Sequence, residues 1–185
     1  MKYVAFLRGI NVGGKNIVKM EDLRTLFIKL GCSEVRTVLN IGNVVFTSDI
    51  TSAEKLTYVI KEGLKSMYAR DIPVLIRSAE QLGNLVASDP FRGIVVTKDT
   101  RLYVTFFSEP PTSMIKIPHA AFENHLKFLR LNDSDLCTEI QISLKYNTID
   151  MIGFIEKEFG SPRTGSGEAG KNITTRNWNT IVRLI

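Results

Sequence analysis

The sequence has few of the residues that staple small proteins or bind metals. Its 185 residues include two cysteines, two histidines and one tryptophan. Cys32 and Cys137 are far apart, so there is no C-x-x-C pair for zinc or redox chemistry. His119 and His125 do not have the spacing of a helical zinc pair. We therefore expect two reduced, buried thiols, no metal site and no cofactor.

Long apolar runs are also missing. No stretch reaches the roughly 18 apolar residues that a membrane span needs. The run that follows Lys2 stops at Arg8, which is too early for a signal peptide. We expect a cytoplasmic protein. With 44% hydrophobic and 23% charged residues, the composition is that of a folded globular chain and excludes disordered, collagen-like and coiled-coil classes.

The formal net charge of +5 is concentrated in two segments. Residues 1–20 hold four basic residues and no acidic one, and residues 159–178 hold three basic residues against one acidic residue. The same two segments contain seven of the 13 glycines. A long nucleic acid usually binds to a broad basic stripe. Two basic, glycine-rich segments on a nearly neutral body instead favour a small anion.

Hydrophobic spacing predicts the elements of the first half. They are a strand at 3–7, a helix at 20–30, strands at 35–39 and 44–47, a helix through 56–67, a strand at 74–76 and a short helix. Thr51 and Glu54 form a capping-box pattern that would open the long helix, and Ser78 and Gln81 would open the short one. This order is the split βαβ order of a ferredoxin-like plait.

The second half predicts a looser version of the same order. Its expected elements are a strand at 102–107, an irregular helical piece within 108–125, strands at 126–131 and 138–146, a helix at 149–159, a Gly/Ser loop at 160–172 and a helix at 174–184. The alternation in 138–146 predicts an antiparallel strand with one wet face. The predicted fold class is α+β, with two ferredoxin-like subdomains, 1–90 and 91–185, that a duplication would explain.

The segment 8–18 has the first candidate site. Gly9 to Lys15 fit the string G-x-x-x-x-G-K, but Asn16 stands where a P-loop has the Ser or Thr that holds Mg²⁺. We therefore do not predict a P-loop. Gly13 and Gly14 can still turn backbone N–H groups toward an anion, with Arg8, Lys15 and Lys19 adding charge. The alternative is a wide turn with solvated cations, in which Asn11 and Asn16 cap backbone groups.

The segment 171–180 has the second candidate site. Thr174 or Thr175 would cap the last helix, which would place Arg176 and Asn177 in its first turn beside Lys171. A helix N-terminus with an arginine and an amide suits an anion. Trp178 can stack on a ring, or it can anchor the helix to the core.

Several strings together are similar to a known family. They are Leu7-Arg8-Gly9-Ile10-Asn11-Val12-Gly13-Gly14-Lys15-Asn16, Met20-x-x-Leu23-Arg24, Leu30-Gly31, Gly42-Asn43-Val44-Val45-Phe46 and Thr175-Arg176-Asn177-Trp178-Asn179-Thr180. This pattern resembles the bacterial domain-of-unknown-function family numbered 1697. Members typically carry a Gln-Ser-Gly-Asn turn where this chain has Asn40-Ile41-Gly42-Asn43. The resemblance implies two plait-like subdomains and supplies no activity, substrate or catalytic residue.

The function that the sequence favours is binding of a small phosphorylated or anionic, nucleotide-like ligand by the two basic loops. The candidate ligand-binding residues are Arg8, Asn11, Gly13, Gly14, Lys15, Asn16, Lys171, Arg176, Asn177 and Trp178. One alternative is an enzyme of phosphoryl or acyl transfer at the same site, although no nucleophile–base pair is visible. Others are single-stranded nucleic-acid binding, for which residues 44–46 offer one ring, and a purely structural or partner-binding role.

Overall fold

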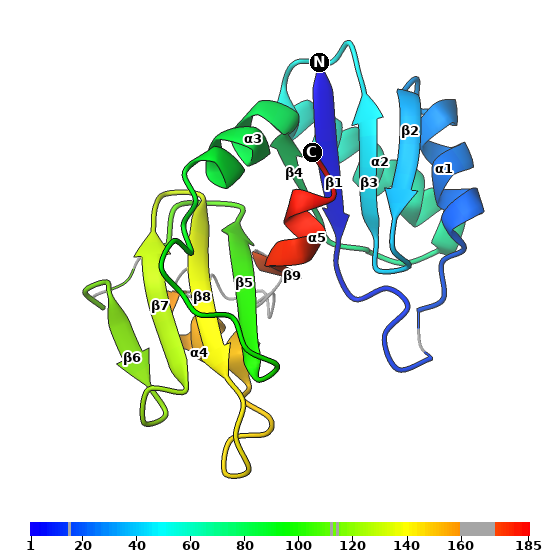
Figure 1. The fold of residues 1–185 in the computed structure, drawn as a ribbon. Helices are drawn as coiled ribbons and strands as arrows, with labels where there is room; N and C mark the ends of the chain where they lie inside the picture. Colours follow the sequence, from blue (N-terminus) through cyan, green and yellow to red (C-terminus); the bar gives the residue numbers. More distant parts are fainter. Residues whose placement is uncertain (15, 112, 114, 160–172) are drawn as a thin grey trace. The chain divides into compact units, whose positions relative to one another are not determined.

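The computed structural model describes residues 1–14, 16–111, 113, 115–159 and 173–185 (Figure 1). These residues form two compact units, Met1–Asn84 with Arg183–Ile185, and Leu85–Val182. Lys15, Lys171 and the predicted Gly/Ser loop at 160–172 lie outside the described residues. Within the described ranges, no helix has the length and apolar character needed to cross a membrane.

The first unit contains one antiparallel sheet and helices on one of its faces. Its elements are β1 (Lys2–Leu7), α1 (Met20–Lys29), β2 (Ser33–Val38), β3 (Asn43–Thr47), α2 (Ala53–Tyr68) and β4 (Val74–Ser78), and α3 (Ala79–Ala87) follows. The sheet order is β2-β3-β1-β4, and each neighbouring pair is antiparallel. This is the strand order that the predicted split βαβ arrangement requires.

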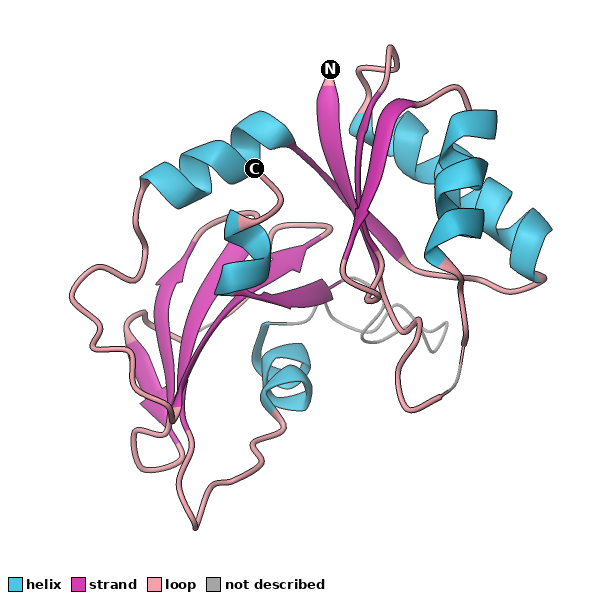
Figure 2. Ribbon diagram, turned by 45° about the vertical axis from the view of Figure 1, so that its right-hand side comes forward, coloured by secondary structure: helices cyan, strands magenta, loops and turns pink. Residues whose placement is uncertain are grey.

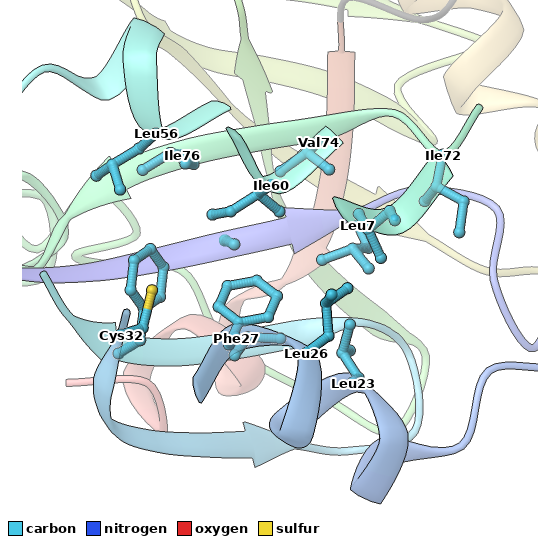
Figure 3. Packing of buried hydrophobic residues seen from close by; sticks show 14 of the residues in the cluster. Leu7, Leu23, Leu26, Phe27, Cys32, Leu56, Ile60, Ile72, Val74 and Ile76 are labelled. Carbon is cyan, nitrogen blue, oxygen red and sulfur yellow. The ribbon is translucent and has the colours of Figure 1, made fainter. Parts of the chain in front are cut away.

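The core of the first unit lies between the sheet and the pair α1 and α2 (Figures 2 and 3). Each helix contributes a buried stripe three and four residues apart, as an amphipathic helix does. The buried helix residues are Leu23, Leu26 and Phe27 of α1 and Leu56, Ile60 and Leu64 of α2. The Phe27 ring meets the edge of the β3 residue Phe46 at a centroid distance of 5.1 Å. This packing fixes the C-terminal end of β1, where the loop 8–18 begins.

The two predicted capping boxes have different outcomes. The Ser78 hydroxyl accepts from the Gln81 backbone N–H at 3.0 Å, and the Gln81 side chain accepts from the Ser78 N–H at 2.9 Å, which confirms the box that opens α3. The box predicted at Thr51 is wrong by one residue. The N-cap of α2 is Ser52, whose hydroxyl accepts from the Lys55 N–H at 3.2 Å. Both residues have a suitable hydroxyl, so the sequence did not distinguish them.

The second unit contains the other sheet. Its elements are β5 (Thr100–Phe107), β6 (His119–Ala121), β7 (Leu126–Leu131), β8 (Asp135–Gln141), α4 (Met151–Phe159), β9 (Ile173–Asn177) and α5 (Trp178–Val182). The order is β6-β7-β8-β5-β9, so the strands β7-β8-β5-β9 repeat the order of the first sheet. The α+β prediction is confirmed, and a common origin of the two halves stays a prediction.

The predicted helical piece within 108–125 is wrong. Among the described residues between β5 and β7 there is no helix, and the short edge strand β6 is present instead. Pro110, Pro111 and Pro118 each lack a backbone N–H and disfavour a helix interior. Among its described residues, the second unit therefore has α4 alone in a position equivalent to the paired helices of the first unit.

The strand predicted at 138–146 with one wet face is also wrong. β8 ends at Gln141 and is buried along both faces, while Leu144 beyond it is fully exposed. Glu139, with 5% exposure, has polar partners inside the sheet. Its carboxylate lies 3.4 Å from the Lys127 ammonium and accepts from the Gln141 amide at 2.7 Å. Glu139 is therefore a buried group with hydrogen-bond and ion-pair partners, and it does not mark a solvated face.

The helix predicted from Thr174 begins later. Residues Ile173–Asn177 form β9, and Trp178 is the first residue of the five-residue helix α5. The Thr175 hydroxyl lies 2.8 Å from that of Thr105 on the neighbouring strand β5. Ile173, Thr174 and Thr175 are β-branched and favour a strand, so neither threonine caps a helix.

Candidate functional site

Side-chain hydrogen bonds close the loop 8–18. The Asn11 amide donates to the Val18 and Asn40 carbonyls at 2.9 Å each and accepts from the Val18 N–H at 2.8 Å. The Asn16 amide donates to the Gly9 carbonyl at 2.9 Å, and the Asn11 N–H donates to the Asn16 carbonyl at 3.1 Å. Both asparagines therefore hold the loop in shape. Their side-chain donors are used within the chain, and they position the residues between them.

Those intervening residues include two exposed glycines in the left-handed region. Gly13 and Gly14 have φ values of +58° and +71°, which glycine adopts without the strain that most other residues would incur. A Cβ at either position would meet nothing within 4 Å, so conformation and not space accounts for these glycines. Their exposed backbone can be approached closely by a ligand. α1 begins at Met20, so no helix N-terminus follows directly as in a P-loop.

Arg70 is a cation of this loop that sequence reasoning missed. Its Nη1 donates to the Asn16 side-chain oxygen at 2.8 Å, and its guanidinium lies over the Tyr68 ring at 5.7 Å. Arg70 follows α2 and is 54 residues from Asn16 in sequence, so no local motif connects the two. Together Asn16 and Tyr68 fix where the guanidinium lies.

The remaining edge of the Arg70 guanidinium is shielded. Its Nε and Nη2 are buried and have no hydrogen-bond partner among the described residues, and the same holds for the Tyr68 hydroxyl. The pKa of Tyr68 is raised, first by burial and then by Asp22, while Arg70 lowers it. Nε and Nη2 form the fork that pairs with both oxygens of a carboxylate or phosphate. Buried polar groups without a partner are rare in proteins.

Arg8 lies where β1 passes into the loop. Its backbone N–H donates to the Pro73 carbonyl at 2.9 Å, and its side chain is half-buried. The preceding Leu7 N–H donates to the Gly42 carbonyl at 2.8 Å. Lys19, immediately before α1, is exposed. Arg8 and Lys19 therefore flank the described part of the loop, and Arg70 contacts it through Asn16.

Arg176 is not at a helix N-terminus, which corrects the prediction made from the sequence. It lies in β9 with 8% exposure and donates from Nη1 to the Thr174 hydroxyl at 2.8 Å and the Thr175 carbonyl at 2.9 Å. Burial lowers the pKa of Arg176 to about 10. The positive charge predicted for an exposed loop is therefore inside the second unit.

Asn177 and Trp178 line a cavity of about 580 Å³ in the second unit. The Trp178 ring meets the Phe91 ring at 5.1 Å and an interplanar angle of 65°, so it does anchor α5. The Asn177 side-chain oxygen accepts from the Asn179 N–H at 3.0 Å. Residues 8–16 belong to the first unit and Arg176, Asn177 and Trp178 to the second. A site that combines both segments stays a prediction.

Comparison with known proteins identifies the family. Residues 1–125 match the family described as "Protein of unknown function (DUF1697)". The chain belongs to this family. This membership confirms the resemblance that we found in the loop 8–18 and in the Gly42-Asn43 turn. The family description assigns no activity. No curated protein matches the DUF1697 chain.

A solved structure has a similar fold. It is described as a conserved bacterial protein, SP0830, from Streptococcus pneumoniae. The two chains are 21% identical, with a TM-score of 0.59, over 99% of this DUF1697 chain and 96% of that chain. At this identity the likeness shows the fold alone.

Proposed function

We propose that the loop 8–18 of the first unit binds a small phosphorylated or otherwise anionic ligand. Gly13 and Gly14 would offer backbone N–H groups, while Arg8, Lys15 and Arg70 would supply positive charge. Asn11 and Asn16 would act by holding the loop, which their hydrogen bonds within it support. The proposal includes a cytoplasmic location, which suits the two free, buried cysteines Cys32 and Cys137.

The fork of Arg70 is the observation that carries this proposal. Asn16 holds one guanidinium nitrogen, and the Nε and Nη2 edge has no partner among the residues described. Leaving such donors unpaired costs about 1–3 kcal/mol or more for a charged group. An oxyanion that reached this shielded edge and bound it in a bidentate manner would satisfy both nitrogens. A fixed guanidinium also loses less side-chain entropy on binding than a solvated lysine does.

Isothermal titration of the protein with inorganic pyrophosphate tests the proposal. A hydrogen bond to a charged group contributes about 1.5–3 kcal/mol, so Arg70→Ala should weaken binding roughly 10- to 150-fold. Arg70→Lys keeps the charge but not the fork, and should recover only part of the affinity. Lys61→Ala is the matched control, because it removes one exposed charge of α2 in the same unit.

Comparing these variants shows whether the anion binds at Arg70 or is attracted by charge in general. Equal loss of affinity in Arg70→Ala and Lys61→Ala would mean that bulk charge alone attracts the anion. No heat from the wild-type protein with pyrophosphate, or full affinity in Arg70→Ala, would refute the proposed site. Far-UV circular dichroism of each variant verifies that the first unit is still folded.

A further inference from the structure

The cavity of the second unit combines aromatic, apolar and cationic side chains, a combination that the loop 8–18 does not offer. Its lining residues come from the segment 89–102, which includes the first residues of β5, from the end of β9 and from the start of α5. The volume of about 580 Å³ is within the range of about 300–1,000 Å³ that small-molecule sites occupy. Ligand sites are typically apolar clefts with a few convergent polar groups, so the composition of the walls is informative.

Four of the lining residues are aromatic or aliphatic. They are Trp178, Phe91, Val96 and Leu102. Phe91 is buried, and its ring packs against the Trp178 ring at an interplanar angle of 65°, with the ring centroids 5.1 Å apart. Trp178 itself is half-buried, and Val96 is exposed. A rigid, partly exposed indole that a second ring supports is a surface on which a planar ring can stack.

Two other lining residues, Lys98 and Arg101, are cationic, and hydrogen bonds fix Arg101. Arg101 Nη1 donates to the Lys98 carbonyl at 2.7 Å and to the Thr100 carbonyl at 2.9 Å. Its Nε and Nη2 have no partner among the described residues, so the fork that pairs with an oxyanion is unused there. Lys98 adds an exposed ammonium group to the lining.

The other lining residues are polar, and most of them already have partners within the chain. Asp89, the only acidic side chain among the lining residues, is paired with Arg92 at 3.2 Å. The Asn177 side-chain oxygen is bonded to the Asn179 N–H, so its NH₂ group is the part left to donate. The Thr97 and Thr100 hydroxyls lie 3.1 Å apart and hold the loop.

We infer that this cavity binds a planar aromatic ring that carries an anionic group, the chemistry of a nucleoside monophosphate. The ring stacks on Trp178, the anion pairs with Arg101 and Lys98, and the Asn177 amide donates to a ring acceptor. These residues all belong to the second unit, so the inference does not rest on Arg70 or on the loop 8–18.

Trp178 is the only tryptophan of the chain, so intrinsic fluorescence reports on this cavity directly. AMP should change that fluorescence in a saturable way. Adenosine lacks the anion and ribose 5-phosphate lacks the ring, so each should bind about tenfold or more weakly than AMP, a difference of one charge-assisted pair or one stack. No saturable change with AMP, or equal affinity for AMP and adenosine, overturns the inference.

Variants test the two cationic lining residues. Lys98→Ala should weaken AMP binding about tenfold and leave adenosine unchanged, because it removes one exposed charge-assisted contact. Arg101→Ala should have the same effect. Because Arg101 also bonds the backbone of its own loop, its replacement could loosen that loop, and Lys98→Ala gives a test that avoids this change. Lys157→Ala, an exposed charge on α4, is the control and should bind AMP normally. AMP affinity unaffected by both Lys98→Ala and Arg101→Ala overturns the inference.

Arg70→Ala separates this inference from the proposed function. It should weaken pyrophosphate binding in the first unit roughly 10- to 150-fold and leave the AMP-dependent change of Trp178 fluorescence intact. Loss of the Trp178 response in Arg70→Ala contradicts a self-contained site in the second unit.

Discussion

Replacing Gly42 with alanine tests how the turn between β2 and β3 supports the loop 8–18. Gly42 has a φ of +80°. A Cβ there would lie 2.8 Å from the Leu7 Cβ, 2.8 Å from the Ile10 Cδ1 and 3.0 Å from the Leu7 carbonyl oxygen. Two of these atoms are fixed by the position of β1, so they cannot rotate away. The substitution must therefore move the turn or the start of the loop.

Two effects set the expected magnitude of Gly42→Ala. The left-handed backbone costs an L-residue about 1–2 kcal/mol. Overpacking against a well-packed neighbour typically costs about 1–3 kcal/mol more. We therefore expect the free energy of unfolding to fall by about 2–5 kcal/mol. Because Leu7 and Ile10 flank Arg8, pyrophosphate affinity should fall as well.

Gly31→Ala is the matched control for Gly42→Ala. Gly31 is in the same unit and has a φ of +83°, but a Cβ there meets nothing within 4 Å. It should lose only the conformational part, about 1–2 kcal/mol, and keep full affinity for pyrophosphate. Urea denaturation followed by far-UV circular dichroism measures both variants. Equal destabilisation of the two would refute the close approach of the turn to β1.

Two further predictions concern stability. Ser52→Ala should lower the free energy of unfolding by about 1 kcal/mol, because it removes the N-cap side chain of α2. Thr51→Ala should have little effect. If urea denaturation showed the larger loss for Thr51→Ala, the N-cap would be Thr51 and not Ser52. Burial raises the pKa of the Cys137 thiol to about 12 from 9.0, so the folded state holds its proton more tightly than the unfolded state. The stability that this provides is complete below pH 9 and is lost as the pH rises toward 12. Urea midpoints should therefore fall more steeply above pH 9 in the wild type than in Cys137→Ala, and parallel curves would contradict the shift.

Local patterns were sufficient for much of the first unit. The spacing of Leu23 and Phe27 located α1, and the reciprocal pair Ser78 and Gln81 located the start of α3. These signals act within a few residues, so the sequence contains them. In the second unit, the alternation around Glu139 was misread, because its partner Lys127 is on another strand. Tertiary partners of that kind leave no local signal.

The candidate site follows the same division. The glycines and asparagines of the loop 8–18 were visible as a string, although the string did not reveal that Asn11 and Asn16 bond to the loop itself. Arg70 was invisible, because only the folded chain brings it to Asn16. Arg176 was assigned to a helix N-terminus, since a β-branched strand followed by a short helix resembles a capped helix in sequence.

The most direct test of the anion site is a ¹H–¹⁵N NMR titration with pyrophosphate. The Arg70 side-chain Nε–H and the Gly13 and Gly14 amides report on the proposed ligand contacts individually. The proposal predicts that all three resonances shift together and saturably, and that the amide shifts weaken sharply in Arg70→Ala. Saturable shifts confined to other residues, with the Arg70 Nε–H unmoved, would contradict the site.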